Sequence, residues 1–389
     1  MARGPYQILL LGSRDDNRHL LREILIKRAA DLGLDPDTVM FIDEQHAKNR
    51  DRRAPAMAVF FGSTAHATDS PFLRELLDDS IIIAPVVSSL KQVNSEIPPQ
   101  LRHINAMEIG AASIERLANL VLETFRLLRR QRKIFVSYKR TDAQAFADRL
   151  YDALDARGFD VFIDVRSVPP AVDFQSELWH RMSDSDVVVL IDTPGFRQSR
   201  WTTAELARAN ATNIQILHLL WPGQHEDGSS SFSHFMRLSR GDFRWWIPAG
   251  GKRVRKKTLV AICAEAERLR ARAIAARYRY LVDNFCNAAR DLGMNPVVQP
   301  EQWIALNNVD GARELAVVPA VGVPTSDRIN EVFDEIAAPT KSMRDIWIVY
   351  DNRGVLDSWL THLDWLDRHL PLRTVRMAKA PELLSKFRS

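Results

Sequence analysis

The chain has 389 residues and a formal net charge of +4, with 46% hydrophobic and 26% charged residues. This length exceeds one ordinary hydrophobic core and predicts two or three domains, while the composition excludes a disordered or fibrous protein. No window holds about eighteen consecutive apolar residues, so no membrane span is expected. The opening MARGPYQILLLGSRDD lacks the apolar core and cleavage site of a signal peptide, so a cytoplasmic location is expected.

Cysteine and basic residues exclude further classes of site. Cys263 and Cys286 show no metal-binding spacing. Their separation would allow a disulfide, but two buried free thiols in a reducing compartment are predicted. The basic residues concentrate in Arg129–Lys133 and Gly251–Tyr280. Such runs are usually solvated helix faces and no nucleic-acid-binding motif accompanies them, so we expect neither a metal site nor a nucleic-acid partner.

The first block, about residues 1–130, alternates apolar runs with helical stretches. The apolar runs are Gln7–Gly12, Val39–Asp43, Met57–Gly62 and Ile81–Val87, and helical spacing covers Asn17–Leu32, Phe72–Asp79 and Ile114–Arg130. Short continuous apolar runs separated by helices predict buried parallel strands. The block is therefore predicted to be an α/β domain with a parallel sheet.

The second block, about residues 131–250, has the same alternation. Its predicted strands are Lys133–Tyr138, Asp160–Asp164, Asp186–Ile191 and Ile214–Leu220, and its predicted helices are Asp142–Arg157, Gln175–Ser183 and one that ends near Ala211. Gly158 is suited to end the first helix, and Pro169 and Pro170 exclude a helix from the loop VRSVPPAVDF. Residues 223–250 are predicted to be a polar insertion or an extended loop.

The remainder of the chain is predicted to comprise a basic helical connector, about residues 251–290, and a small α/β domain, about residues 291–389. Strands are expected at Asn295–Val298, Leu315–Pro319, Asp345–Tyr350 and Leu372–Met377, with a helix at Asp357–His369. This domain is a candidate sensor or oligomerisation module. The predicted fold class is thus α/β, a central domain with a parallel sheet flanked by two further α/β blocks.

Four motifs of the second block occur in a specific order. They are KIFVSY followed by a helix that Asp142 leads, GFDVFID, a proline-containing loop, and SRWTTAEL. Together they resemble a Toll/interleukin-1 receptor (TIR) domain of the bacterial NADase type, over about residues 132–222. The resemblance implies a flavodoxin-like fold and an NAD⁺ glycohydrolase that cleaves the nicotinamide–ribose bond, with NAD⁺ as substrate and no cofactor.

In the family that this block resembles, the glutamate four residues after the tryptophan is catalytic, and the matching residue is Glu205. Loss of nicotinamide leaves positive charge on the ribose, which a nearby carboxylate stabilises. The leaving group is already cationic, so one carboxylate suffices. The alternative is structural, because Thr202-x-x-Glu205 fits a capping box and an acidic residue is favoured in a first helical turn. The four motifs together favour the catalytic role.

The resemblance also implies residues that line the substrate site. Ser137, Tyr138, Lys139 and Arg140 follow the first strand, and Lys139 or Arg140 could donate to the pyrophosphate of NAD⁺. A solvated basic loop is the alternative for these two residues. Trp201 is expected either to shape the pocket of Glu205 or to cover the edge of the core.

Asp164 ends the second predicted strand, and Arg166–Phe174 corresponds to the BB loop of the family. Pro169-Pro170 replaces the usual Pro-Gly of this loop, and Phe174 replaces a tryptophan. The loss of the glycine removes backbone freedom. Asp164, Arg166 and Phe174 are nevertheless expected at the substrate site, although the departure puts in doubt whether the loop moves as in the family.

The resemblance further implies self-association, because the BB loop of one TIR subunit commonly completes the pocket of its neighbour. A homo-oligomer or filament, an activating ligand or phage-derived trigger, and a role in antiphage defence are therefore expected. A non-enzymatic TIR scaffold that recruits partners through the BB loop is the alternative. A nucleoside deoxyribosyltransferase-like enzyme fits the tandem architecture poorly. Whether the product is linear or cyclic ADP-ribose stays open.

A weak internal repeat relates the first two blocks. ILLLGSRDD at residues 8–16 is similar to IFVSYKRTD at 134–142, and SPFLREL at 70–76 is similar to SRWTTAEL at 199–206. Duplication predicts that the first block is TIR-like, whereas chance similarity between small α/β domains is the alternative. Pro71 and Phe72 replace the Arg-Trp pair despite the presence of Glu75, so the first block is predicted to be non-catalytic.

Overall fold

The computed structural model describes residues 6–64, 70–163, 174–196, 212–226, 233–244, 253–308, 314–337 and 345–388. Of residues 111, 112, 174, 175, 253 and 337 it describes only the backbone. Contacts divide the chain into two compact units, residues 1–130 and 131–389. Each unit is described by itself.

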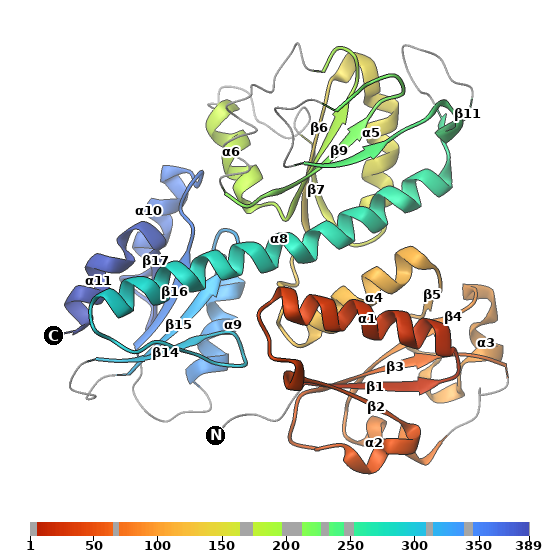
Figure 1. The fold of residues 1–389 in the computed structure, drawn as a ribbon, viewed down its shortest axis with the longest axis horizontal. Coiled ribbons are helices and arrows are strands. Elements are labelled where there is room, and N and C mark those ends of the chain that lie inside the picture. Colours follow the sequence, from red (N-terminus) through yellow and green to blue (C-terminus); the bar gives the residue numbers. More distant parts are fainter. Residues whose placement is uncertain are drawn as a thin grey trace. The chain divides into compact units, whose positions relative to one another are not determined.

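The first unit is a parallel sheet of five strands in the order β2-β1-β3-β4-β5 (Figure 1). The strands are β1 (Tyr6–Gly12), β2 (Val39–Asp43), β3 (Ala56–Phe61), β4 (Ile82–Val87) and β5 (Met107–Glu108). The helices are α1 (Asp15–Asp31), α2 (Pro71–Asp78), α3 (Val93–Glu96) and α4 (Ala111–Thr124). Every residue of β1 is buried, as expected of a central parallel strand with both faces covered.

The second unit begins with a sheet in the equivalent order, β7-β6-β8-β9-β10, and its strands are also parallel. The strands are β6 (Lys133–Tyr138), β7 (Asp160–Ile163), β8 (Val187–Asp192), β9 (Gln215–Leu220) and β10 (His234–Arg237), and the helices described around them are α5 (Arg140–Asp155) and α6 (Phe174–Asp184). A short antiparallel pair follows, β11 (Phe243–Arg244) and β12 (Arg253–Val254). The predicted flavodoxin-like α/β fold is confirmed.

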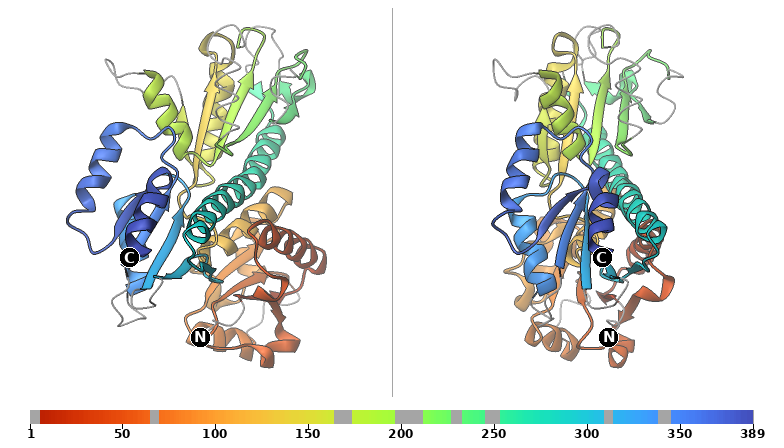
Figure 2. Two further views of the ribbon diagram at one scale, coloured as in Figure 1. Left: turned by 60° about the vertical axis from the view of Figure 1, so that its left-hand side comes forward. Right: turned by 90° about the vertical axis from the view of Figure 1, so that its left-hand side faces the viewer.

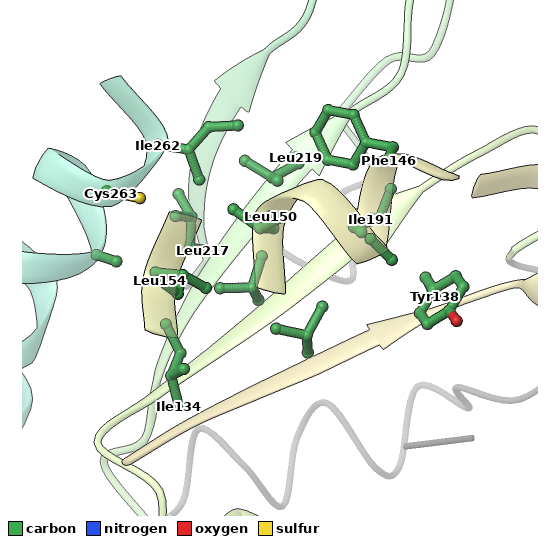
Figure 3. Packing of buried hydrophobic residues seen from close by; sticks show 14 of the residues in the cluster. Ile134, Tyr138, Phe146, Leu150, Leu154, Ile191, Leu217, Leu219, Ile262 and Cys263 are labelled. Carbon is green, nitrogen blue, oxygen red and sulfur yellow. The ribbon is translucent and has the colours of Figure 1, made fainter. Parts of the chain in front are cut away.

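The two faces of this second sheet carry separate hydrophobic clusters. On one face, Tyr138 and Ile191 pack with Phe146 and Leu150 of α5, as Figure 3 shows. On the other face, Leu190 packs with α6 and with Phe196. Successive residues of a strand point to opposite faces, so Ser137, between Val136 and Tyr138, lies on the α6 face.

A single helix, α8 (Lys256–Asp291), joins this sheet to the last part of the chain (Figures 1 and 2). Its first half contributes Cys263 and Leu269 to the α5-side cluster, and its second half contributes Phe285 to the cluster of the next sheet. Arg270 of α8 is fully buried, and its Nε lies 3.0 Å from Asp186 Oδ2. The predicted basic helical connector is therefore a packed core helix of this unit.

The last sheet has the order β13-β14-β15-β16-β17, in which β15, β16 and β17 are parallel. Its strands are β13 (Val297–Val298), β14 (Ile304–Asn307), β15 (Glu314–Ala320), β16 (Asp345–Tyr350) and β17 (Arg373–Arg376), and its helices are α9 (Ser326–Ala337), α10 (Asp357–Leu366) and α11 (Ala380–Arg388). It contacts the carboxyl end of α6. The Val323 N–H donates to Asp184 Oδ1 at 3.0 Å, and His180 stacks on Trp359 at 5.8 Å.

Short 3₁₀ helices complete the described elements, at Pro36–Thr38, Glu44–Asn49, Leu90–Gln92, Pro99–Leu101, Arg240–Asp242 and Met377–Lys379. Cys263 and Cys286 are buried free thiols, as predicted. Burial raises the pKa of Cys263 to about 11, so this thiol stays protonated at neutral pH.

Two predictions about elements are wrong. The helix predicted for Ile114–Arg130 ends at Thr124, because Arg126 adopts a positive φ of 61° and Leu127 and Leu128 turn back to the carbonyl of Leu122. The stretch predicted as a polar insertion contains β10, which pairs in parallel with β9. Its half-exposed sequence HFMR is that of an edge strand and lacks a continuous apolar run.

Candidate functional site

The strand order of the second sheet reverses between β6 and β8. Counted along the chain, the second strand lies on one side of β6 and the third lies on the other. In open parallel sheets, ligands bind at such a switch point, outside the carboxyl ends of the strands. β6 ends at Tyr138 and β8 ends at Asp192, one position beyond the residue paired with Tyr138. The candidate site is therefore built from the residues that follow these two.

Asp142, in the first turn of α5, joins the two loops. Thr193 Oγ1 donates to Asp142 Oδ2 at 3.0 Å, and Thr141 Oγ1 donates to Oδ1 at 2.8 Å. The N–H of Gly195 also bonds to this carboxylate. Burial alone would raise the pKa of Asp142, but these hydrogen bonds and the charge of Lys139 outweigh it and lower the pKa. Asp142 is thus an ionised carboxylate whose hydrogen bonds connect the loop after β6 to the turn after β8.

Gly195 lies close to the side chains of Asp142 and Lys139. A Cβ at position 195 would lie 2.4 Å from Lys139 Nζ and 2.6 Å from Asp142 Oδ2. A side chain there would displace the ammonium group, so the glycine allows Lys139 to approach the turn. Lys139 is half-buried and Arg140 is exposed. The switch point therefore holds a cation whose position depends on both loops.

The other predicted residues of this strand end are buried. Ser137 has no exposed surface, and Tyr138 is 1% exposed. The Tyr138 side chain points into the α5-side core near Phe146 (Figure 3). Of the four residues predicted after the first strand, the structure therefore places only Lys139 and Arg140 with accessible side chains.

The structure does not describe the side chains of the remaining predicted residues. Asp164, Arg166, Trp201 and Glu205 lie outside the described residues. Phe174 is described only in its backbone, as the first residue of α6. Their predicted roles stay predictions.

Sequence reasoning did not single out Asp142, Thr193 or Gly195 as site residues. Residues 192–195 (DTPG) have the composition of a turn, but nothing in the sequence pairs them with Asp142. It also passed over His218, an imidazole within the apolar run IQILHLL. Within the described ranges, no group of three or more His, Cys, Asp or Glu side chains has metal-binding geometry.

The corresponding edge of the first sheet is arranged differently. Glu96 accepts from the backbone N–H of Ser88 at 2.7 Å and from the Ser88 hydroxyl, and Arg14 Nη2 lies 3.0 Å from the same carboxylate. Arg14 Nε also donates to the carbonyl of Gly62 at 2.7 Å. Glu96 and Arg14 together thus cross-link the loops after β1, β3 and β4.

Glu75 of α2, the residue that corresponds in the repeat to Glu205, has basic partners. Its Oε1 lies 3.0 Å from Arg50 Nη1 and 3.0 Å from Arg52 Nη2. Arg50 is almost completely buried and also lies 2.7 Å from Asp79. Glu75 therefore takes part in an ion-pair cluster that fastens α2 to the loop before β3.

Comparison with known proteins identifies a domain in part of the chain. Residues 134–245 match the TIR domain family model, so the chain contains a TIR domain. Its sheet is the one formed by β6 to β10. No curated protein matches the chain.

Two solved structures that align with the chain share little detail with it. A putative two-component system response regulator/GGDEF domain protein aligns at 11% identity and a TM-score of 0.29, covering 67% of this chain and 97% of its own. Salmonella D-lactate dehydrogenase aligns at 12% identity and a TM-score of 0.18, covering 68% and 96% respectively. Among the described residues, no helix is both long enough and apolar enough to cross a membrane.

Proposed function

We propose that the TIR domain of this chain is an NAD⁺ glycohydrolase in which Glu205 is the catalytic carboxylate. The observation that carries the proposal is that the glutamate motif closely follows the candidate site in the sequence. The segment SRWTTAEL begins four residues after Gly195, whose turn is bound to Asp142 beside Lys139 at the switch point. The carboxylate motif of the family thus follows directly from the edge where a parallel sheet binds ligands.

The chemistry needs few groups. The bond between ribose C1′ and the nicotinamide nitrogen breaks, and its electron pair neutralises the positive charge of the pyridine ring. The ribose is left as an oxocarbenium-like cation, which the carboxylate of Glu205 stabilises and orients. Water then adds to C1′ and loses a proton to give ADP-ribose. Attack by an adenine nitrogen instead would give the cyclic product.

The remaining residues would bind the rest of the dinucleotide. Lys139 and Arg140 are suited to the pyrophosphate, since both are cations and both follow β6. Ser137 and Tyr138 would support this strand end from within the core. Trp201 would shape the pocket around Glu205.

Asp164, Arg166 and Phe174 would contribute from the loop after β7. In the family this loop reaches the pocket of a neighbouring subunit, so we propose that hydrolysis requires self-association. A role in antiphage defence, with depletion of NAD⁺ after an activating signal, follows from the same proposal.

The test measures nicotinamide release from NAD⁺ by the purified full chain over a series of protein concentrations. We expect specific activity to rise with concentration, and Glu205→Gln to lower it at least about 100-fold, the loss typical of removing one electrostatic stabiliser. Glu205→Gln should keep the unfolding midpoint of the wild type. Equal release by the two proteins would refute the role of Glu205, and activity in neither would favour the scaffold function.

A further inference from the structure

A buried pair of ionisable side chains lies beneath the candidate site and has no part in the chemistry above. Asp192 is the last residue of β8, and His218 lies in the neighbouring strand β9. His218 Nε2 is 3.3 Å from Asp192 Oδ2, and the two side chains are 5% and 0% exposed. The imidazole also stacks on Phe235 of β10, with ring centroids 5.2 Å apart.

The surroundings of the pair are apolar. His218 lies two residues after Ile216 and therefore on the same face of β9, and Ile216 belongs with Leu190 to the cluster on the α6 face. Burying an aspartate and a histidine together contributes little net stability, because the desolvation of the two groups offsets their attraction, and hydrophobic residues of similar volume often replace such a pair without loss. The stability of the sheet therefore does not account for an aspartate and a histidine at these positions.

The position of Asp192 connects the pair to the site. Its backbone carbonyl accepts from the N–H of Trp221 at 3.0 Å. The next residue, Thr193, donates to Asp142, and Gly195 abuts Lys139. An Asp192 side chain that is fixed at the strand end therefore fixes where the turn begins, and the turn in turn fixes Asp142 and Lys139.

We infer that His218 is a positioning residue of the TIR site, which holds Asp192 and through it the turn that places Lys139 for the diphosphate of NAD⁺. The inference rests on the proposed function for its substrate. It does not require His218 to touch NAD⁺. The expected signature is a change in KM, because the ammonium group that the turn places binds the part of the substrate that does not react.

The experiment compares His218→Leu, His218→Gln and the double variant Asp192→Asn/His218→Leu in the full chain. His218→Leu removes the imidazole that contacts the buried carboxylate of Asp192. The unfolding midpoint should therefore fall and the KM for NAD⁺ should rise. The contact of His218 with Asp192 lacks hydrogen-bond geometry, so a polar side chain of similar length should replace it, and His218→Gln should retain a KM within about threefold of the wild type.

The double variant separates positioning from stability. It removes both ionisable groups, so its unfolding midpoint should return to that of the wild type. Its KM should stay raised about tenfold with kcat changed less than about threefold. A KM that recovers together with the midpoint would overturn the inference and leave a purely structural pair.

A second measurement does not depend on hydrolysis. Amide hydrogen exchange should quicken in the double variant at residues 139–142 and 193–196 and stay unchanged in β6 and β9. If the wild type releases no nicotinamide, the proposed function fails, yet this exchange pattern still supports the positioning role. Unchanged exchange at residues 139–142 overturns the positioning role whether or not the chain hydrolyses NAD⁺.

Discussion

The first and second sheets of this chain have the same strand order and differ at the edge where their strands end. In the first sheet, Glu96 lies at the carboxyl ends of the strands and bonds to Arg14 and Ser88. In the second, Asp142 joins two loops and leaves Lys139 half-buried beside a glycine turn. Both edges are organised by one ionised carboxylate. In the first sheet that carboxylate closes a cross-link between loops, and in the second it positions a cation.

The two glutamates of the repeat also differ between the first and second sheets. Glu75 and Glu205 occupy corresponding points in the sequence, but Glu75 pairs with Arg50 and Arg52. A carboxylate neutralised by two guanidinium groups is poorly suited to stabilise a cationic ribose. The shared strand order is the one that duplication predicts, but it is common to flavodoxin-like folds, so it does not distinguish duplication from chance similarity.

The largest expected difference between the two sheets is in the stability lost when a glycine at the carboxyl ends of the strands is replaced by alanine. Gly12 has a φ of +76°, and a Cβ there would lie 2.1 Å from the Phe61 carbonyl oxygen. Gly12→Ala should therefore destabilise the first unit by roughly 3 kcal/mol or more, from backbone strain and overlap together. Hydrogen exchange resolved by peptide would report this loss. Nicotinamide release should be unchanged, because the second unit carries the TIR domain.

The matched change at the second edge should have the opposite profile. A Cβ at Gly195 would meet the ends of two side chains, Lys139 Nζ and Asp142 Oδ2, and its three nearest atoms all belong to side chains, which can shift more easily than backbone. Gly195→Ala should thus cost less than about 1 kcal/mol of stability and raise the KM for NAD⁺ severalfold. If Gly12→Ala lowered hydrolysis while Gly195→Ala did not, the functional edge would have been assigned to the wrong sheet.

A smaller effect should follow acidification of the first unit. Burial raises the pKa of Glu96, but bonds from Ser88 and the charge of Arg14 outweigh it and hold the pKa below its ordinary value. A carboxyl whose pKa is lowered by folding stabilises above its unfolded pKa, about 4.3 for glutamate, and loses that contribution as the pH falls through the folded value. Stability of the first unit should therefore decrease below about pH 4.

Glu96→Gln provides the control for this pH dependence. It should cost about 2 kcal/mol at pH 7, the scale of hydrogen bonds to a charged group, and the difference from the wild type should shrink as the pH falls. Peptide-resolved hydrogen exchange at several pH values would measure both effects. A difference that is independent of pH would mean that the charge of Glu96 does not stabilise the edge.

The sequence predicted the central strands of all three sheets because those strands are continuous apolar runs buried on both faces. It missed β5 and β10, since short or half-exposed edge strands have no such run. It also missed β14, an interior strand of only four residues, of which one is exposed and one half-buried. It also missed α9, whose Ile329, Val332 and Phe333 have helical spacing. The predicted helix after Ile114 was too long because Leu127 and Leu128 continue the apolar spacing while the backbone turns back.

The site was predictable only where a local motif marks it. Lys139 and Arg140 follow a recognisable strand, so their place at the switch point could be expected. The bond between Asp142 and Thr193 joins residues 51 positions apart and exists only because β6 and β8 pair in one register. The Asp192–His218 contact depends in the same way on the register of β8 and β9. Such pairings are properties of the sheet and not of either segment.

The smallest expected effect, Glu75→Gln, tests the comparison most directly. Arg50 would keep Asp79 at 2.7 Å, and Glu75 is partly exposed, so the loss should be no more than about 1 kcal/mol in the first unit. Nicotinamide release should be unaffected, in contrast to Glu205→Gln. Asp79→Asn is the matched control, since it removes the other carboxylate that pairs with Arg50 and should behave alike. If Glu75→Gln alone lowered hydrolysis, its ion pairs would have to open during turnover, and the first sheet would contain a second active site.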